Sequence, residues 1–231
     1  MGTQGVEPPV RPAFYALRPG GWRDYVTLLH PPYTVWHLSY VAIGAALAPV
    51  FHLDRMLWAL AAFALAMGVA AHALDELNGR PLRTRISDRT LVALAVVSLA
   101  GALAIGVYGA IEWGYGLLVF VAAGAFLVPA YNLELFGGRF HTDWWFAFAW
   151  GGFAALTGFF VEAQSLRLEG LLAAGYATAL SLAQRRLSTP VRHARRTLGD
   201  TTGMEPLERA LRALTWTAVL IACALVAARL T

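Results

Sequence analysis

The sequence is poor in charge and in cysteine, and it contains no lysine. Only 14% of its 231 residues are charged, whereas 58% are hydrophobic and the mean hydropathy is +0.55. Because a soluble domain carries about 25% charged residues, this composition excludes an ordinary soluble enzyme and predicts an integral membrane protein. The single cysteine, Cys223, excludes an intrachain disulfide.

The N-terminal region also lacks the features of a secretory signal. The first 30 residues contain no short apolar core followed by a small-residue cleavage site. Residues 1–33 are rich in proline, glycine and aromatic residues, including Trp22, Tyr25 and Tyr33. Aromatic side chains of this kind gather where a membrane meets water. We therefore predict that residues 1–33 form an interfacial segment and that residues 34–231 form the membrane domain.

Long apolar segments fill the rest of the chain. A helix needs about 20 mainly apolar residues to cross a bilayer. Seven segments meet this need, at about 34–52, 56–77, 90–110, 114–133, 144–162, 168–186 and 207–229. Because their connections are short, the sequence predicts an all-α integral membrane protein with one compact bundle of about seven transmembrane helices.

The arginines predict how this bundle is oriented. With the N-terminus inside, only Arg55, Arg167 and Arg229 fall outside, in agreement with the positive-inside rule. An odd number of spans then places the C-terminus outside the inner (cytoplasmic) membrane. The two charged inner loops, at about 76–89 and 186–206, are expected to face one cytoplasmic cavity. The net charge of +4 beside apolar spans favours anionic phospholipids or a phosphorylated ligand as partners, and no nucleic acid.

The end of the second predicted span concentrates candidate site residues. His72, Asp75 and Glu76 lie three or four residues apart and are expected to share one helix face. Ionisable residues at such a position are uncommon and often functional. Two interpretations remain open. The three side chains could hold Mg²⁺, which also takes phosphate ligands, or the acids could pair with Arg80 or Arg83 and organise the loop.

Further candidates lie at the ends of the fourth and fifth spans. Tyr131 and Asn132 could orient a polar acceptor, although such residues are also common at a membrane interface. Gly151 and Gly158 predict close helix packing and no ligand role. Glu162 is expected to face the head groups at the outer end of the fifth span.

The order of these features resembles the UbiA-type intramembrane prenyltransferase superfamily. The family ends its second span with N-x-x-x-D-x-x-x-D, often followed by Arg-Pro and an Ile-Ser pair. Here Ala71, Asp75 and Gly79 stand at the three motif positions, and Arg80-Pro81 and Ile86-Ser87 follow. After the sixth span, Thr197-Leu198-Gly199 matches the end of the family's second aspartate motif, but its two aspartate positions fall on Arg186 and Pro190.

The resemblance implies a UbiA-like helical bundle that binds an isoprenyl diphosphate or another isoprenoid lipid at the cytoplasmic face. It implies Asp75 as the catalytic residue and, with Glu76 and His72, as a ligand of Mg²⁺. It also implies Tyr131 and Asn132 at the acceptor. In the family Mg²⁺ holds the diphosphate, but arginines can also bind phosphate oxygens. They could hold the diphosphate here or contact lipid phosphates instead, and the candidates are Arg80, Arg83, Arg185, Arg186 and Arg192.

The missing aspartates leave the activity open. The family's two-motif magnesium clamp cannot be assembled from these residues, so a divergent prenyltransferase with a reduced metal site is one possibility. The alternative is an inactive UbiA-like pseudoenzyme, which binds a lipid or quinone or serves as a structural subunit beside partner subunits of a membrane complex.

Overall fold

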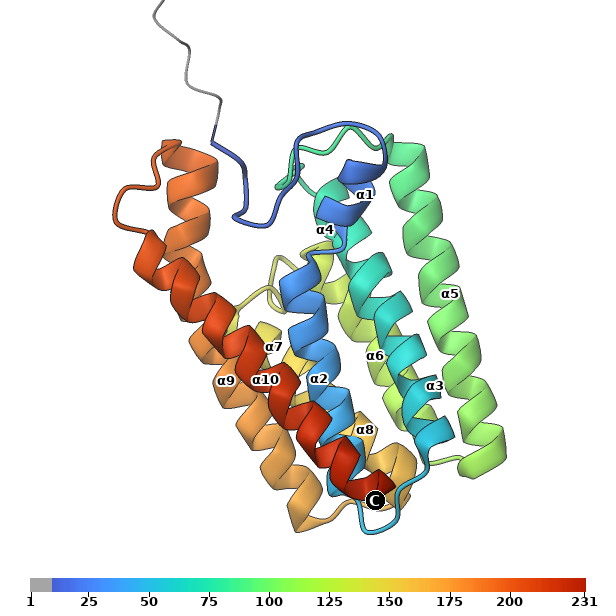
Figure 1. Ribbon diagram of the computed structural model, residues 1–231. Coiled ribbons are helices and arrows are strands. Elements are labelled where there is room, and N and C mark those ends of the chain that lie inside the picture. Colours follow the sequence, from blue (N-terminus) through green and yellow to red (C-terminus); the bar gives the residue numbers. More distant parts are fainter. Residues whose placement is uncertain (1–9) are drawn as a thin grey trace, which may run out of the picture.

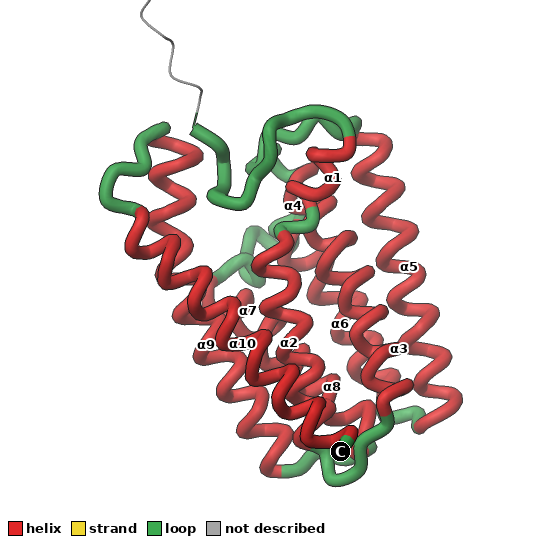
Figure 2. Tube along the Cα trace, in the orientation of Figure 1, coloured by secondary structure: helices red, strands yellow, loops and turns green. Residues whose placement is uncertain are grey.

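The computed structural model describes residues 10–231, so the first nine residues of the predicted interfacial segment lie outside the described residues. The described part is helical and contains no strand. After a short helix, α1 (Trp22–Leu28), seven helical rods run up and down in one bundle (Figures 1 and 2). The rods are α2 (Pro31–Leu47), α3–η1–α4 (Leu53–Phe63, Ala64–Ala71, His72–Leu77), α5 (Asp88–Trp113), α6 (Leu117–Asn132), α7–η2–α8 (Asp143–Ala147, Phe148–Gly152, Phe153–Ala163), α9–η3 (Leu168–His193, Ala194–Leu198) and α10 (Glu205–Leu230).

Each of the seven predicted spans falls on one rod. Within the described residues, four rods are long and apolar enough to cross a membrane, namely Leu53–Leu77, Asp88–Trp113, Asp143–Ala163 and Glu205–Leu230, and α6 is a shorter apolar helix. The prediction of an all-helical protein with membrane-spanning helices is therefore confirmed at this level. That all seven rods cross the bilayer stays a prediction.

The second predicted inner loop, at 186–206, is wrong. Helix α9 continues to His193, and η3 extends it to Leu198, so the connection to α10 is only a few residues long. Pro190 lies inside this helix without ending it. The Arg192 guanidinium supports the same turn, because it donates to the hydroxyl oxygens of Ser188 (2.8 Å) and Thr189 (3.0 Å). The arginines of this region therefore project from a rigid helix.

Helix α2 lies in the bundle against α8, and glycines bring the two backbones into contact. A Cβ atom on Gly44 would lie 1.9 Å from the Ala155 carbonyl oxygen, and one on Gly158 would lie 2.1 Å from a carbonyl oxygen of α2. A Cβ on Gly151 would lie 2.5 Å from a carbonyl oxygen of α9. The prediction that Gly151 and Gly158 allow close helix packing is confirmed.

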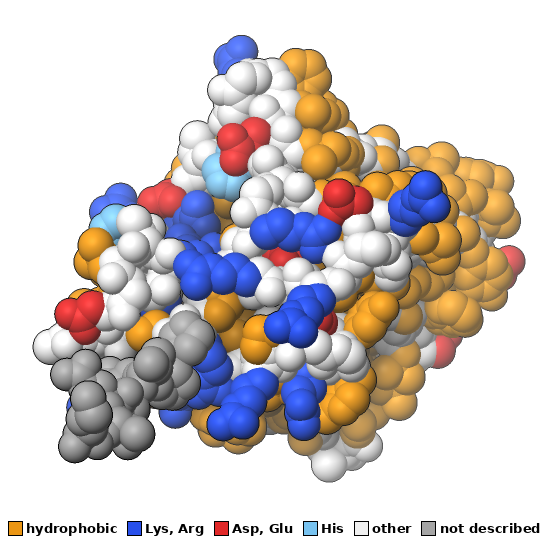
Figure 3. All heavy atoms as spheres, turned by 90° about the horizontal axis from the view of Figure 1, so that it is seen from above, with side chains coloured by type: hydrophobic (Ala, Val, Ile, Leu, Met, Phe, Trp, Pro, Cys, Tyr) orange, Lys and Arg blue, Asp and Glu red, His pale blue; other side chains and the backbone are white. Residues whose placement is uncertain are grey.

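The two ends of the bundle differ in charge. We call the end formed by residues 10–30, the 78–87 loop and residues 185–204 the arginine-rich end. Figure 3 looks onto this end and shows arginine side chains gathered across it. The C-terminus lies at the opposite end (Figure 1), where the Arg229 guanidinium donates to the backbone carbonyls of Ala48 (2.8 Å) and Pro49 (3.0 Å).

The expectation that Glu162 faces lipid head groups is wrong. Its side chain is fully buried, and one carboxylate oxygen accepts the backbone N–H of His52 at 2.8 Å. The same oxygen lies 2.9 Å from Nδ1 of the His52 ring. The connection between α2 and α3 thus folds across the end of α8 and covers this carboxylate.

Candidate binding cavity

A polar cavity of about 220 Å³ opens among the helices at the arginine-rich end. Its walls come from the N-terminal segment, α2, α4, the end of α6, the region of α7 and η2, and the last turns of α9 with η3. Segments far apart in the sequence therefore meet around one space. Its charged and imidazole side chains are Arg185, Arg192, Arg195, Arg196, Asp75, His30, His37, His72 and His141.

Two of the four arginines are already neutralised. Nε of Arg185 lies 2.8 Å from a carboxylate oxygen of Asp143, and its guanidinium lies 5.1 Å from the centre of the Phe146 ring. Nε of Arg195 lies 2.6 Å from a carboxylate oxygen of Glu208, and this pair is largely buried. These two arginines shape the wall of the cavity but have little charge left for a ligand.

The other two arginines have no carboxylate partner among residues 10–231. The Arg192 guanidinium binds only the hydroxyl groups of α9 described above, and Nε of Arg196 donates to the Pro12 carbonyl at 3.4 Å. Arg192 and Arg196 lie one turn apart, at positions i and i+4, and both line the cavity. They place two positive charges at its wall that no ion pair of the described residues neutralises.

Among the described residues, Asp75 is the only carboxylate that lines the polar cavity. Within the described part of the chain its carboxylate takes part in no hydrogen bond or ion pair, whereas its backbone carbonyl accepts the N–H of Asn78. It is half-buried at the end of the α3–η1–α4 rod. Its oxygens are therefore available to a ligand.

Glu76, although adjacent to Asp75, points elsewhere. Its side chain is completely buried, and its two oxygens accept three hydrogen bonds from the 78–87 loop. The donors are the backbone N–H of Leu82 (2.9 Å), the backbone N–H of Thr84 (2.8 Å) and the hydroxyl of Thr84 (2.9 Å). Glu76 organises the loop through backbone amides, whereas the sequence suggested arginine partners.

The three predicted Mg²⁺ ligands are therefore not brought together. Glu76 is used by the loop, and Nδ1 of His72 binds the carbonyl of Gly68 at 3.0 Å, which leaves Asp75 as the one free carboxylate. Across residues 10–231, no three His, Cys, Asp or Glu side chains are grouped as a metal site would need. One carboxylate beside several arginines does not fit Mg²⁺, which prefers oxygen ligands of high negative charge.

The predicted diphosphate residues separate into two groups. Arg185 and Arg192 line the polar cavity, whereas Arg80, Arg83 and Arg186 do not. Arg80 is bound to Asp88 and to the Ile86 carbonyl within the loop. Arg83 donates to the backbone carbonyl of Arg196 at 2.8 Å, and Arg186 is exposed on α9.

Tyr131 and Asn132, the predicted acceptor residues, both line the polar cavity. The Tyr131 ring stacks on His141 with centroids 4.5 Å apart, and the His141 Nδ1 lies 3.0 Å from the Tyr131 carbonyl oxygen. The Asn132 amide nitrogen donates to the Val128 carbonyl at 2.7 Å. The Tyr131 hydroxyl has no partner among residues 10–231, so it can donate to a molecule in the cavity.

Unpartnered polar atoms are concentrated in this cavity. Five buried side-chain polar atoms of the described residues lack a hydrogen-bond partner, and four of them belong to residues that line it. These four are Nε2 of His30, Nδ1 of His37, the hydroxyl of Tyr131 and Oε1 of Gln184. Because more than 90% of buried polar groups are normally paired, the cluster indicates a space that takes a polar molecule.

Three π-helical segments position the site. η1 ends directly before His72, η2 contains Trp150, and η3 contains Arg195 and Arg196. A π-turn adds a residue to the helical repeat and redirects the side chains that follow, and such turns are frequent at functional sites. All three of these segments carry or directly precede residues that line the cavity.

The N-terminal segment covers part of the cavity. Pro12, Phe14 and Tyr15 line it, and Nη1 of Arg195 donates to the backbone carbonyl of Arg11 at 3.3 Å. Sequence patterns did not reveal this role, because the contact joins residues 184 positions apart. The histidines offered a better signal, since four of the six in the chain line the cavity.

His30 makes this end of the protein sensitive to acid. Its ring stacks on His72 with centroids 4.1 Å apart and an angle of 8°, and its Nδ1 lies 2.8 Å from the Tyr15 hydroxyl. Burial lowers the pKa of His30 well below its usual value, and the positive charges of His72, Arg196 and Arg192 lower it further. The folded protein therefore favours the neutral ring.

We expect the protein to lose stability as the pH falls below about 6.5, the usual His pKa. Above that pH the contribution of His30 is fully present. Below that pH, His30 of the unfolded chain binds a proton that the buried ring in the folded protein does not bind. The contribution of His30 to the free energy of unfolding therefore falls by at most about 1.4 kcal/mol per pH unit. Thermal unfolding in detergent at pH 5 and pH 7.5 measures this difference. His30→Asn should reduce the difference in unfolding temperature between the two pH values, whereas His193→Asn, at an exposed position, should leave it unchanged. The same difference in the wild-type protein and both variants would contradict the prediction.

Comparisons with known proteins found no relative: no protein-family model, no curated protein and no solved structure matches the chain.

Proposed function

We propose that the protein is a membrane protein that binds a phosphorylated isoprenoid lipid, with the phosphate groups in the polar cavity. One observation carries the proposal. Arg192 and Arg196 present two positive charges without ion-pair partners to a cavity that holds one carboxylate, Asp75, and several buried polar atoms without partners. Guanidinium groups bind phosphate oxygens through paired, charge-assisted hydrogen bonds, and an anion would neutralise the excess charge.

The membrane setting and the resemblance to UbiA-type proteins support an isoprenoid as the lipid. Long apolar helices flank the cavity, so its ligand can be an amphiphile whose chain stays in the bilayer. We propose a UbiA-like bundle of seven spans in the inner membrane, with the N-terminus in the cytoplasm and the C-terminus outside. In this orientation the arginine-rich end faces the cytoplasm, where anionic phospholipids also favour arginine.

Prenyl transfer is the second candidate function, and the free carboxylate of Asp75 in the same cavity favours it. In that reaction the bond between C1 of the isoprenyl chain and the diphosphate oxygen breaks, and C1 bonds to the acceptor. Asp75 would take the proton that the acceptor loses, while Arg192 and Arg196 stabilise the departing diphosphate. The alternative is an inactive protein that only holds the lipid, alone or with partner subunits.

The test is binding and diphosphate release by detergent-purified protein given geranylgeranyl diphosphate and a lipid extract as acceptor source. We expect binding that persists in EDTA, because the arginines and not a metal hold the head group. Asp75→Asn should bind at least as tightly, since it removes a negative charge from an anion site. If transfer occurs, the same variant should release diphosphate at least 100-fold more slowly, the usual scale of general-base catalysis.

The outcomes separate the candidates. Binding without release identifies a lipid-binding protein, and release that Asp75→Asn abolishes identifies a transferase. Binding that requires Mg²⁺ would contradict the arginine site, and no binding under either condition would overturn the proposed function.

A further inference from the structure

The loop that joins α6 to α7 exposes large apolar side chains. Phe136 is 68% exposed, and Leu133 and Leu135 are exposed beside it. We call residues 133–140 the aromatic loop, because the Phe136 ring also lies against the ring of Phe140, with centroids 5.9 Å apart. A group of exposed apolar side chains marks a surface that contacts a membrane or another protein.

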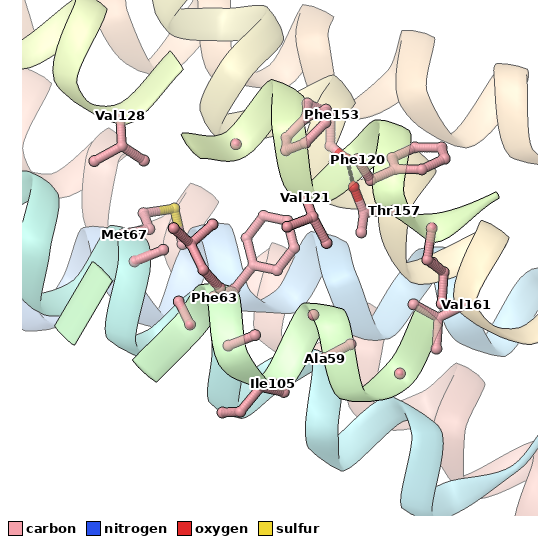
Figure 4. A pocket seen from close by; sticks show the side chains of 18 of the residues that line it. Ala59, Phe63, Met67, Ile105, Phe120, Val121, Val128, Phe153, Thr157 and Val161 are labelled. Carbon is pink, nitrogen blue, oxygen red and sulfur yellow. Dashed lines mark hydrogen bonds between the residues drawn. The ribbon is translucent and has the colours of Figure 1, made fainter. Parts of the chain in front are cut away.

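Helix α6, which leads into this loop, is apolar on two faces. Its inward face lines an apolar cavity of about 110 Å³, to which Phe120 and Val128 contribute (Figure 4). Leu118, Ala122 and Phe126 follow one another at intervals of four residues and are exposed, so they form an outward face. A helix that is apolar all round is typical of a membrane span. The outward face is therefore the one that acyl chains cover.

The aromatic loop continues this outward face of α6. The ring centre of Phe126 lies 5.0 Å from that of Phe140 and 6.0 Å from that of Phe136. The three rings form one cluster on the outside of the helix. Arg139 is exposed in the same loop and makes no ion pair within residues 10–231. Apolar rings beside a free arginine suit the zone where acyl chains meet lipid phosphates.

The length of α6 places the aromatic loop at the level of a membrane surface. Only three residues join α5 to α6, so the two helices meet at the end of the bundle away from the polar cavity. At 1.5 Å per residue, the 26 residues of α5 span about 39 Å and the 16 residues of α6 only about 24 Å. The connection after α6 accordingly lies lower in Figure 1 than the upper end of α5. Because the hydrocarbon core is about 30 Å thick, a helix of this length ends at its boundary.

The backbone of the aromatic loop is suited to this position. Near lipid, backbone polar groups have to be satisfied within the protein. Five N–H groups donate to carbonyls of the loop itself or of the last turn of α6, namely those of Leu133, Glu134, Leu135, Gly138 and His141. Phe136 has a φ angle of +57°, a left-handed conformation that is unfavourable for a bulky residue. Insertion of the Phe136 ring into lipid would offset this strain, whereas exposure of the ring to water would add to it.

We infer that the aromatic loop inserts into the membrane leaflet at the arginine-rich end, with the Phe136 ring among the acyl chains and the Arg139 guanidinium at the lipid phosphates. The inference does not depend on a ligand in the polar cavity. The loop contacts the bilayer and not a partner protein, because its rings continue the lipid-facing side of α6 at the depth of the membrane surface. Tyr131 and His141 flank the loop and line the polar cavity, so the inserted loop holds this side of the cavity at the level of the head groups.

Fluorescence quenching tests this position. The fluorophore NBD is attached to Phe136→Cys in a Cys223→Ala background, and the protein is reconstituted into vesicles of phosphatidylcholine and phosphatidylglycerol. We expect a blue-shifted emission that is lost when the lipids carry a nitroxide near the head group and that iodide, present on both sides of the vesicle, leaves almost unchanged. Leu135→Cys gives a second label position without left-handed backbone. It should show the same order of quenching, and a folding defect at position 136 would not affect it.

The matched control is the same label on Leu198→Cys. Leu198 is 63% exposed, nearly as much as Phe136, and it also lies at the arginine-rich end. Its neighbours in the chain are polar and include Arg196 and Asp200. We expect the opposite order at this position, with quenching by iodide and little effect of the lipid nitroxide. Equal quenching by iodide at both positions would overturn the inference. Protection of the Phe136→Cys label from both quenchers would also overturn it, because a second copy of the chain, and not lipid, would then cover the loop.

Discussion

The double variant Arg192→Gln/Arg196→Gln is expected to bind geranylgeranyl diphosphate at least 100-fold more weakly than the wild-type protein. Each guanidinium would make charge-assisted hydrogen bonds to the phosphate oxygens, and such bonds are worth about 1.5–3 kcal/mol. Loss of both therefore costs about 3 kcal/mol or more, and every 1.4 kcal/mol is about tenfold in affinity. Isothermal titration of detergent-purified protein measures the change directly.

The choice of these two arginines follows from their partners. Arg185 and Arg195 are paired with carboxylates, so their removal would leave Asp143 and Glu208 unpaired. Such variants would lower stability as well as ligand affinity, and the two effects could not be separated. Arg192 and Arg196 make no such pair among the described residues.

The control for this variant is Arg85→Gln/Arg89→Gln. It removes the same charge from the same end of the bundle, at exposed positions that do not line the cavity. We expect its affinity to stay within about twofold of wild type, because exposed charges are screened by salt. An equal loss in both double variants would mean that the ligand responds to the general charge of this end and not to the polar cavity.

Much of the architecture follows from hydropathy alone. In a bilayer every backbone polar group must be satisfied within the segment, so an apolar run of about 20 residues has to be helical. The seven predicted spans accordingly fall on seven rods. The same reasoning placed His72, Asp75 and Tyr131 at the ends of spans and Arg192 in an inner loop, and the structure brings all four to one cavity.

Side-chain direction was harder to predict than position along the helix. Asp75 and Glu76 are adjacent, but neighbouring helical residues point about 100° apart, and only Asp75 reaches the cavity. The π-segment from Ala64 to Ala71 changes the register just before them, and no hydropathy pattern encodes it. The sequence also favoured a loop where α9 continues, because the arginines and Pro190 there are typical of a helix end.

The second large effect is expected from Glu76→Ala, which should lower the free energy of unfolding by about 3 kcal/mol or more. The change would leave two backbone N–H groups and the Thr84 hydroxyl without their acceptor. Each buried polar group left unpaired costs about 1–3 kcal/mol. Thermal unfolding in detergent measures the loss. Limited digestion with trypsin locates it, because the 78–87 loop contains trypsin sites after Arg83 and Arg85 and should become cleavable.

Two further variants decide what Glu76 does. Asp88→Asn weakens an exposed ion pair with Arg80 and removes a charge from the first turn of α5. Both effects are small at an exposed position, about 1 kcal/mol or less each, so the variant controls for general changes in the loop. Glu76→Gln keeps one acceptor oxygen for Thr84 and should fall between wild type and Glu76→Ala. A metal ligand would behave differently: its removal would abolish Mg²⁺-dependent binding and leave the trypsin pattern unchanged. Because the carboxylate is buried behind the loop and outside the cavity, we expect the loss of stability and the new cleavage, with Mg²⁺ making no difference to either.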